Sequence, residues 1–255
     1  MKIGVQTNAW SDDIHYQAIG RMVSEIAECG YDGLEIGAHR VNLDQPAHFR
    51  KLVEALNLKI AGIHTGGAIY DGQAMESVLA GLPRVAAFAA AAGSTNLMFS
   101  GRAKEGGKTA EDFRIEAGLL NRAGEIARQH GLTLCFHNHY WEIEQDCREL
   151  DAICSLTDPA LVSLCLDIGW VHRAGGSPVK VMQAYANRIA VIHLKDQVDN
   201  QHWTEVGSGV IDFPAIIKAA VEHPEWWLTV ERDQTMPDAK ASSLLSRNYL
   251  KTLGL

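Results

Sequence analysis

The sequence predicts an α/β protein that folds as one (β/α)8 barrel, a single domain over residues 1–255. Short apolar, β-branched runs alternate with longer stretches of helical spacing from one end of the chain to the other. A chain of this length suits a barrel, and neither a linker nor a break in composition divides it. The rival fold is an open doubly wound sheet, which is disfavoured because no glycine-rich phosphate loop follows the first strand.

Eight runs have the almost wholly apolar character of parallel strands that are covered on both faces. In chain order they are Ile3–Gln6, Gly33–Ile36, Ile60–His64, Asn96–Ser100, Leu132–His137, Val162–Asp167, Ala190–Leu194 and Trp227–Glu231. The segments between them are predicted to be helices; Ala86–Ala92, for example, is nearly all alanine, a strong helix former. Glycine stands where a helix should end before three of the strands, at Gly30, Gly93 and Gly131.

Composition and charge exclude several classes of protein. Apolar residues make up 47% of the chain and charged residues 21%, which is normal for a globular protein in water. The net charge of −8 comes without any basic block, so no nucleic-acid partner is expected. Five scattered cysteines with no CxxC pair indicate reduced thiols and a cytoplasmic location. We see no signal peptide and no apolar run of the roughly 18 residues that a membrane span needs.

Ionisable residues interrupt the apolar strands at their C-terminal ends. Because side chains alternate along a strand, the bulky Leu, Ile and Phe residues share one face and smaller or polar residues share the other. If the bulky face packs on the helices, the polar face lines the barrel lumen. Four ionisable residues then meet at the C-terminal mouth, where barrel enzymes carry their chemistry: His137, Asp167, His193 and Glu231.

A cation is the simplest explanation for carboxylates and imidazoles that share one cavity. A lone buried histidine is usually hydrogen-bonded in the core, and a strand-end carboxylate can cap a helix, so a purely structural network is the alternative. Isolated buried charges, however, cost several kcal/mol each. We therefore expect one divalent metal ion. Ligands rich in carboxylate and free of sulfur favour Mn²⁺, with Mg²⁺, Co²⁺ and Zn²⁺ as alternatives.

Six short motifs, in this order, resemble the xylose isomerase-like TIM barrel superfamily over the whole chain. They are Gly30–Glu35, Gly62–His64, Leu166–Trp170, Ile192–Asp196, Glu205–Phe213 and Val230–Arg232. The superfamily of sugar phosphate isomerases and epimerases includes ketose 3-epimerases, hydroxypyruvate isomerases and inosose dehydratases, together with a metal-dependent endonuclease. The motifs are specific for the superfamily and not for a substrate.

The resemblance implies that one metal ion is held by three residues of this chain, Asp167, His193 and Glu231. The epimerase relatives take their fourth ligand from a glutamate in strand five, where this chain has His137. The segment from Phe136 to Glu142 is instead similar to the histidine-rich strand of the inosose dehydratases. Glu142 is the expected fourth ligand, with His137 itself as the alternative and Glu144 as a weaker one. With Glu142 in that role, His137 and His139 are expected to support the metal site or take part in catalysis.

The activity expected from these residues is that of a metal-dependent isomerase or epimerase. Its substrate would be a small keto-sugar or a polyol-derived carbonyl compound that reacts through a metal-stabilised enediolate, with Glu231 as a base. A histidine at the end of strand five can also protonate a leaving hydroxyl. The close alternative is therefore an inosose dehydratase-like or 3-oxo-glycoside lyase that works by β-elimination. A DNA-repair endonuclease, disfavoured by the acidic charge, and a non-catalytic sugar-binding module are further alternatives.

Other polar and aromatic residues near the strand ends are expected to line the pocket. Lys195 lies two residues after His193 on the same strand face, so we expect it to stabilise an oxyanion. The predicted substrate-binding residues are Glu35, His64, His172, Glu205, Trp10 and Trp170, with Trp141 as a further part of an apolar wall. The neighbouring Trp226 and Trp227 suggest an exposed apolar surface that a homo-oligomer would use, with ordinary packing as the alternative.

Overall fold

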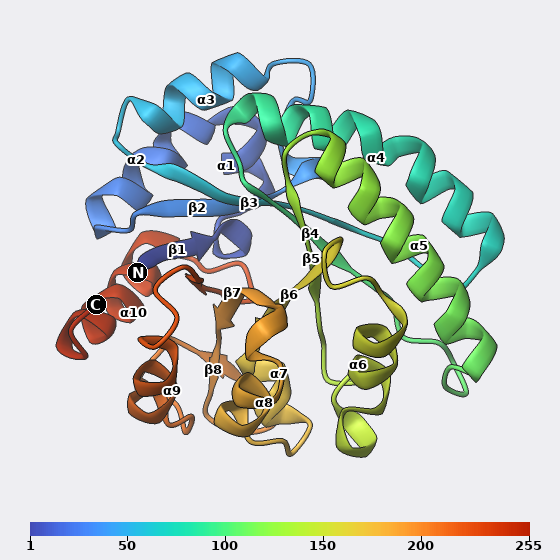
Figure 1. Cartoon of the computed structure of the whole chain (residues 1–255). Coiled ribbons are helices and arrows are strands. Elements are labelled where there is room, and N and C mark those ends of the chain that lie inside the picture. The colour runs from blue at the N-terminus through green and yellow to red at the C-terminus, as the bar shows by residue number, and fades with distance from the viewer.

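The computed structural model confirms the barrel: eight parallel strands close on themselves in the order β1-β10-β7-β6-β5-β4-β3-β2 (Figure 1). The structure describes the backbone of residues 1–255 and the side chains of residues 1–71, 74 and 76–255. The barrel strands are β1 (Lys2–Gln6), β2 (Gly33–Gly37), β3 (Lys59–Gly66), β4 (Asn96–Ser100), β5 (Thr133–His137), β6 (Val162–Asp167), β7 (Ile189–Leu194) and β10 (Trp227–Val230). Each corresponds to one predicted strand.

Helices form a ring around the outside of the barrel (Figure 1). They are α1 (Asp12–Gln17), α2 (Ile19–Cys29), α3 (Pro46–Glu54), α4 (Gly72–Ala92), α5 (Ala110–Gln129), α6 (Glu144–Leu156), α7 (Ile168–Arg173), α8 (Pro178–Ala184), α9 (Phe213–Ala220) and α10 (Ala239–Thr252). Short 3-10 turns occupy η1 (Thr7–Ala9), η2 (Ala38–Arg40) and η3 (Ala186–Arg188). Thr109 and Asp112 form a capping box that starts α5, and Gly30 ends α2 with a φ of 82°.

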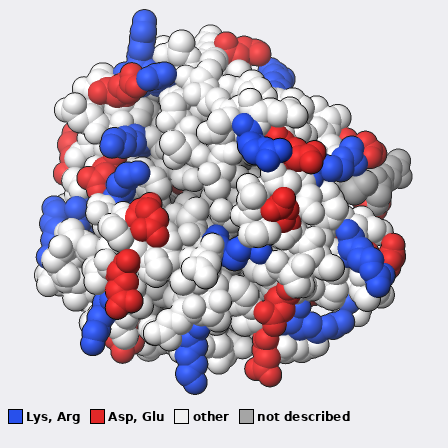
Figure 2. All heavy atoms as spheres, viewed as in Figure 1, with Lys and Arg blue, Asp and Glu red and all other residues white. Residues whose placement is uncertain are grey.

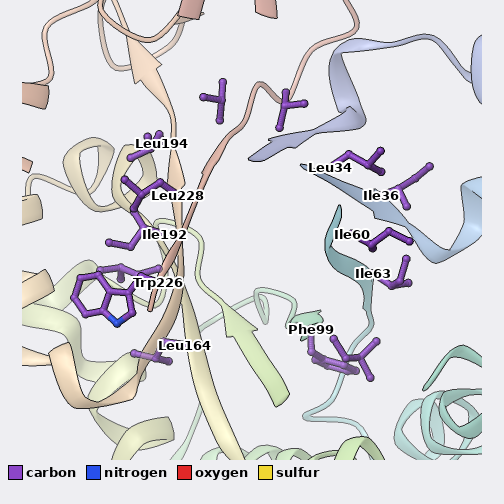
Figure 3. Close-up of a cluster of buried hydrophobic side chains, with 14 of the residues drawn as sticks. Leu34, Ile36, Ile60, Ile63, Phe99, Leu164, Ile192, Leu194, Trp226 and Leu228 are labelled. Carbon is purple, nitrogen blue, oxygen red and sulfur yellow. The ribbon is translucent and has the colours of Figure 1, made fainter. Parts of the chain in front are cut away.

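The two faces of the strands pack into two separate layers, as the alternation predicted. Bulky side chains such as Leu34, Phe99 and Ile192 face the helices and belong to the large outer core (Figure 3). A small inner cluster fills the lumen with Ala61, Met98, Cys135, Cys165, Val191 and Trp227. This inner cluster fills the lumen next to the polar residues of the mouth; Cys135 and Cys165, for example, lie two residues before His137 and Asp167 on the same strand faces.

The tryptophans expected to form an exposed surface are buried. Trp226 is 2% exposed and Trp227 is 4% exposed. Trp226 lies in the outer core (Figure 3), where its ring stacks on His223, whereas Trp227 points into the lumen. The exposed apolar surface expected at this place is therefore absent, and the alternative of ordinary packing holds: Trp226 directly precedes β10 and packs in the outer core, whereas Trp227 begins β10 and packs in the lumen. Over the described residues, no helix is long and apolar enough to cross a membrane. Figure 2 shows basic and acidic side chains interspersed over one face.

A two-stranded hairpin that was not predicted follows β7. Its strands are β8 (Asp196–Gln197) and β9 (Trp203–Thr204), which pair antiparallel. The fully buried carboxylate of Asp196 accepts the backbone N–H groups of Gly207 and Gly209, at 3.0 and 2.9 Å. This contact ties the following loop to the hairpin and holds the hairpin beside the barrel mouth.

Replacing Gly209 should disturb this tie. A Cβ atom at Gly209 would meet the carboxylate of Asp196 and the backbone oxygen of Gln197. We expect Gly209→Ala to lower the free energy of unfolding by about 1–3 kcal/mol, the usual effect of overpacking. Urea unfolding measures the change. Gly118→Ala, in α5 with no atom within 4 Å of the added methyl, is the matched control and should be neutral or stabilising. Equal effects of the two substitutions would contradict the prediction.

Candidate active site

Four buried side chains from four different strands meet at the C-terminal mouth of the barrel. They are His137, Asp167, His193 and Glu231, and each offers one ligand atom within 4.8 Å of the others. His137 and Asp167 are the last residues of β5 and β6, and His193 is the next-to-last residue of β7. Glu231 directly follows β10, and its N–H still donates to Leu194 O at 2.9 Å. We call these four residues the mouth cluster.

Carboxylates hold both ring nitrogens of His193. Nδ1 lies 2.8 Å from Glu231 Oε2, and Nε2 lies 2.8 Å from Glu35 Oε2. Burial alone would lower the pKa of His193, but the surrounding negative charges outweigh burial and raise it well above its usual value. The pKa of Glu231 moves the opposite way: although burial would raise it, Lys195 and His193 bring it well below its usual value.

A chain of hydrogen bonds through Glu35, His64 and Ser100 joins the two histidines of the mouth cluster. Glu35 Oε1 lies 2.9 Å from His64 Nδ1, and His64 Nε2 lies 2.6 Å from Ser100 Oγ. Ser100 Oγ lies in turn 3.3 Å from His137 Nδ1. Burial would raise the pKa of Glu35, but His193 and His64 lower it to about 2, so this carboxylate is ionised. The chain fixes His137 with its Nε2 atom towards Asp167 and Glu231, whose oxygens lie 3.4 and 3.7 Å away.

The ammonium group of Lys195 sits among three carboxylates. Its Nζ lies 2.8 Å from Asp167 Oδ2, 3.0 Å from Glu231 Oε2 and 2.9 Å from Asp233 Oδ2. The side chain is completely buried. Burial opposes the charge, yet the carboxylates, Asp167 first, raise the pKa of Lys195 well above its usual value. Lys195 is therefore a cation that compensates the negative charge of the mouth.

The mouth cluster fits a divalent cation. Two imidazoles and two carboxylates form a sulfur-free set of donors from well-separated strands. His137 Nε2 is buried and has no hydrogen-bond partner among the described residues. Glu35 stands behind His193, as a carboxylate commonly does behind a metal-binding histidine. A second possible set contains Glu35, Cys165 and His193, but burial raises the pKa of Cys165 to about 12, which leaves the thiol protonated.

The structure does not bring Glu142, the expected fourth ligand, into the mouth cluster. Its Oε2 accepts the backbone N–H of His139 at 2.7 Å, and its Oε1 accepts the indole N–H of Trp141 at 2.6 Å. The side chain is fully buried. Burial raises the pKa of Glu142 to about 7, against the opposing charge of Lys108. Glu142 therefore shapes the loop that carries His139 and Trp141, and His137 occupies the place at the end of β5.

Aromatic rings wall one side of the mouth. The His139 ring stacks on Trp141 with centroids 4.3 Å apart and lies 4.9 Å from the His137 ring. Trp170 and Trp203 meet edge to face at 4.8 Å. Lys195 Nζ lies 5.0 Å from the centre of Trp170 and 5.1 Å from that of Trp203. Burial, followed by the charges of His137 and Lys195, lowers the pKa of His139 to about 2, so its imidazole is neutral.

The remaining predicted pocket residues have other partners. Glu35 and His64 belong to the chain of hydrogen bonds that joins His193 to His137. His172 Nδ1 lies 2.7 Å from Gln197 Nε2. Glu205 pairs with Arg232 at 2.7 Å. Trp10 is fully buried, and its indole N–H donates to Glu25 at 2.8 Å, so it packs in the core and offers no face to a substrate. Glu144 is an exposed residue at the start of α6.

Several residues that contact the site were missed in the sequence, including Trp203 of the aromatic wall. Ser100 ends β4 on the lumen face, and Asp233 follows Glu231 at the same two-residue spacing, so the period of two could have found both. Asn138 is different: its Oδ1 accepts the N–H of Asp167 at 2.9 Å, and its side-chain amide donates to the Asp167 carbonyl. No local pattern announces that contact, which forms between adjacent strand ends.

Comparisons with known proteins agree with this architecture. The sequence profile of the xylose isomerase-like TIM barrel family matches residues 23–252. The chain is 27% identical to an inosose dehydratase of Clostridium botulinum, over 98% of this chain and 96% of that protein. It is 32% identical to an inosose dehydratase of Mesomycoplasma hyopneumoniae, over 77% of this chain and 70% of that protein.

Solved structures share the fold at lower identity. An L-ribulose 3-epimerase aligns with a TM-score of 0.82 and 18% identity, over 99% of this chain and 94% of that one. A probable 3-DHS dehydratase from Bacillus anthracis aligns with a TM-score of 0.83 and 14% identity, over 98% and 99%. A sugar phosphate isomerase/epimerase from Parabacteroides distasonis aligns with a TM-score of 0.81 and 23% identity, over 98% of this chain and 93% of that one. At these identities the likeness concerns the fold.

The raised pKa of Glu142 predicts a pH-dependent contribution to stability. Because the folded-state pKa of about 7 exceeds the ordinary 4.5, the folded protein retains a proton that the unfolded chain has lost. The resulting stability is fully present below pH 4.5 and is lost as the pH rises through 7. We expect wild type to lose roughly 3 kcal/mol of unfolding free energy relative to Glu142→Gln across this interval.

Urea unfolding at several pH values measures this difference. Glu144→Gln, an exposed neighbour on the same segment, is the matched control and should follow wild type. The amide of Glu142→Gln accepts one N–H fewer, which adds a constant offset that does not depend on pH. Parallel pH profiles of wild type and Glu142→Gln would show that the expected titration does not occur.

Proposed function

Because the chain belongs to the xylose isomerase-like TIM barrel family, we propose that it is a divalent-metal-dependent lyase that removes water, or another leaving group, from a small polyhydroxylated carbonyl compound. The observation that carries the proposal is the mouth cluster, whose four ligand atoms lie within 4.8 Å of one another in a buried site. The inosose dehydratases among the curated relatives support elimination as the reaction.

The proposed metal ligands are the four residues of the mouth cluster, with His137 in the place first expected for Glu142. Both oxygens of Glu142 already accept hydrogen bonds, whereas His137 Nε2 has no such partner. Mn²⁺ is the expected ion, and Mg²⁺, Co²⁺ and Zn²⁺ are alternatives. A bound divalent cation would polarise the substrate carbonyl and stabilise the negative charge that develops on its oxygen. Glu35 would keep His193 in the orientation that ligation requires.

The side chains around the cluster supply the proton transfers. Glu231 is ionised, because its pKa is held well below the usual value, so it can accept a proton from the carbon next to the carbonyl. Lys195 is protonated and lies 3.0 Å from Glu231, so it can donate a hydrogen bond to a developing oxyanion or to the departing hydroxyl. His139 is neutral, and its buried Nδ1 has no hydrogen-bond partner among the described residues, so it can bind a substrate hydroxyl.

An isomerase or epimerase is the second candidate, because the same ligands and the same base serve an enediolate reaction. Epimerisation needs proton donors and acceptors on both faces of the reacting carbon. In the epimerase relatives a strand-five carboxylate provides one of them, and this chain has His137 there. Elimination needs one base and one acid, roles that Glu231 and Lys195 can fill. This difference favours the lyase.

Loss of a cluster carboxylate should release the metal. We expect Asp167→Asn and Glu231→Gln to abolish turnover and to weaken Mn²⁺ binding roughly tenfold or more. His137→Gln should weaken binding similarly, whereas Glu142→Gln should retain the metal. Elemental analysis after dialysis and calorimetric titration measure retention and affinity, and circular dichroism checks the fold. Glu225→Gln, an exposed carboxylate before β10, is the control. If Glu142→Gln loses the metal and His137→Gln keeps it, the proposed ligand set is incorrect.

The reaction type can be determined from deuterium incorporation and from the mass of the product. The metal-loaded protein is incubated in D₂O with inosose, with a 3-oxo-glycoside and with free ketoses. We expect loss of water or of the aglycone, together with a new conjugated-ketone absorbance. Chelation of the metal should stop the reaction and Mn²⁺ should restore it. Deuterium uptake into a ketose whose skeleton stays intact, without elimination from any substrate, would favour the isomerase instead.

A further inference from the structure

Arg173 lies beside the active site with part of its hydrogen-bonding capacity unused. It is the last residue of α7, the helix that directly follows Asp167. Its guanidinium carbon lies 3.4 Å from the ring centre of Trp203, and its Nε donates to Gln197 Oε1 at 3.1 Å. These two contacts fix the plane and direction of the guanidinium. The remaining donors are on its Nη edge.

Among the described residues, no carboxylate lies within ion-pair distance of Arg173. Its Nη2 is buried and has no hydrogen-bond partner among those residues either. By contrast, Lys195 contacts three carboxylates and Arg40 pairs with Asp12. Burial lowers the pKa of Arg173, against the favourable charges of Asp233 and Asp167, so the folded protein holds this cation in an unfavourable setting. An anion supplied from outside would relieve that cost.

Trp170 provides a second unused donor in the same place. Its indole Nε1 is buried and has no hydrogen-bond partner among the described side chains. The Arg173 guanidinium carbon lies 4.9 Å from the Trp170 ring centre, and Lys195 Nζ lies 5.0 Å from the same centre. The Trp170 ring thus lies within reach of both the free arginine and the lysine of the mouth.

Arg173 and Lys195 both lie close to the Trp203 ring, which limits how far Arg173 can lie from Lys195 and the mouth cluster. Its guanidinium carbon lies 3.4 Å from the centre of Trp203, and Lys195 Nζ lies 5.1 Å from that centre. The two cations are therefore no farther apart than those distances added together. Lys195 itself touches Asp167 and Glu231. This separation is on the order of the length of one sugar-sized molecule.

We propose that the substrate carries a carboxylate that Arg173 and Trp170 bind, which makes it a polyhydroxylated keto acid or a glycoside of a sugar acid. The inference rests on the proposed function, because it assigns the carbonyl of the same molecule to the mouth cluster. A planar guanidinium with a free edge matches the two oxygens of a carboxylate. A carboxylate fits better than a phosphate dianion, because Asp167, Glu231 and Asp233 already place negative charge around Lys195, next to this position.

The test compares ligands that differ only in the carboxylate. D-glucuronate is paired with D-glucose, D-galacturonate with D-galactose, and a glucose phosphate ester is the third probe. Quenching of tryptophan fluorescence or calorimetry gives dissociation constants for the metal-free and the Mn²⁺-loaded protein. We expect at least one acid to bind roughly ten- to a hundredfold more tightly than its neutral partner. Arg173→Gln should remove this preference without changing the affinity for the neutral sugar, and Arg173→Lys should restore part of it.

Arg148→Gln is the matched control, because Arg148 also stacks on an aromatic ring, Phe113, but is exposed outside the mouth. It should leave every affinity unchanged. The proposal is overturned if no acid binds more tightly than its neutral partner, if the phosphate ester is the preferred probe, or if Arg173→Gln weakens acids and neutral sugars equally.

The carboxylate site and the proposed lyase function can fail independently, and the two tests together distinguish these failures. A protein that prefers acids through Arg173 but neither retains a metal nor turns over any substrate supports the carboxylate site and refutes the lyase. A protein that retains the metal and eliminates water from neutral inosose, with no preference for acids, supports the lyase and refutes the carboxylate site.

Discussion

Compensation of buried charge in the lumen is the constraint on which the rest of the site depends. Three carboxylates, Glu35, Asp167 and Glu231, are almost completely inaccessible to water. Each would cost several kcal/mol if it were isolated. None of them is isolated, because His193 contacts both Glu35 and Glu231, and Lys195 contacts both Asp167 and Glu231. Such a set can be buried only if strands far apart in sequence are aligned closely, and the closed barrel provides that alignment.

The alternation of residues along the strands explains why the barrel and the position of the four mouth residues could be predicted from the sequence. For a parallel strand that is covered on both faces, the sequence has to show only which face packs on the helices and which face lines the lumen. In β5 the bulky Leu134 and Phe136 mark the helix-facing side, and Cys135 and His137 mark the lumen side. The same alternation placed four ionisable residues in the lumen at the same level. It could not decide what lies beyond a strand end, where the chain leaves the repeating geometry. Glu142 illustrates this limit.

Glu142 was a reasonable ligand by charge, and its direction is set by a turn of the backbone. The loop after β5 bends so that Glu142 accepts the N–H groups of His139 and Trp141, both close in sequence. Gln145, Asp146 and Cys147 follow with positive φ, a conformation that non-glycine residues seldom adopt and that no sequence pattern announced. Trp226 and Trp227 show the converse: two adjacent large rings suggested a surface, but each is buried in a different layer.

The two sides of the mouth differ in what they can contribute to a reaction. On the side of β2, β3 and β4, Glu35, His64 and Ser100 satisfy one another and the histidines, so their donors and acceptors are already used. On the side of β6 and β7, Trp170 and Arg173 have donors without partners, and they adjoin Lys195. Polar groups that are already paired hold neighbouring groups in place, whereas buried donors without partners are stabilised when a ligand arrives. The first side therefore orients the mouth cluster, whereas the second offers buried donors that the proposed substrate would engage.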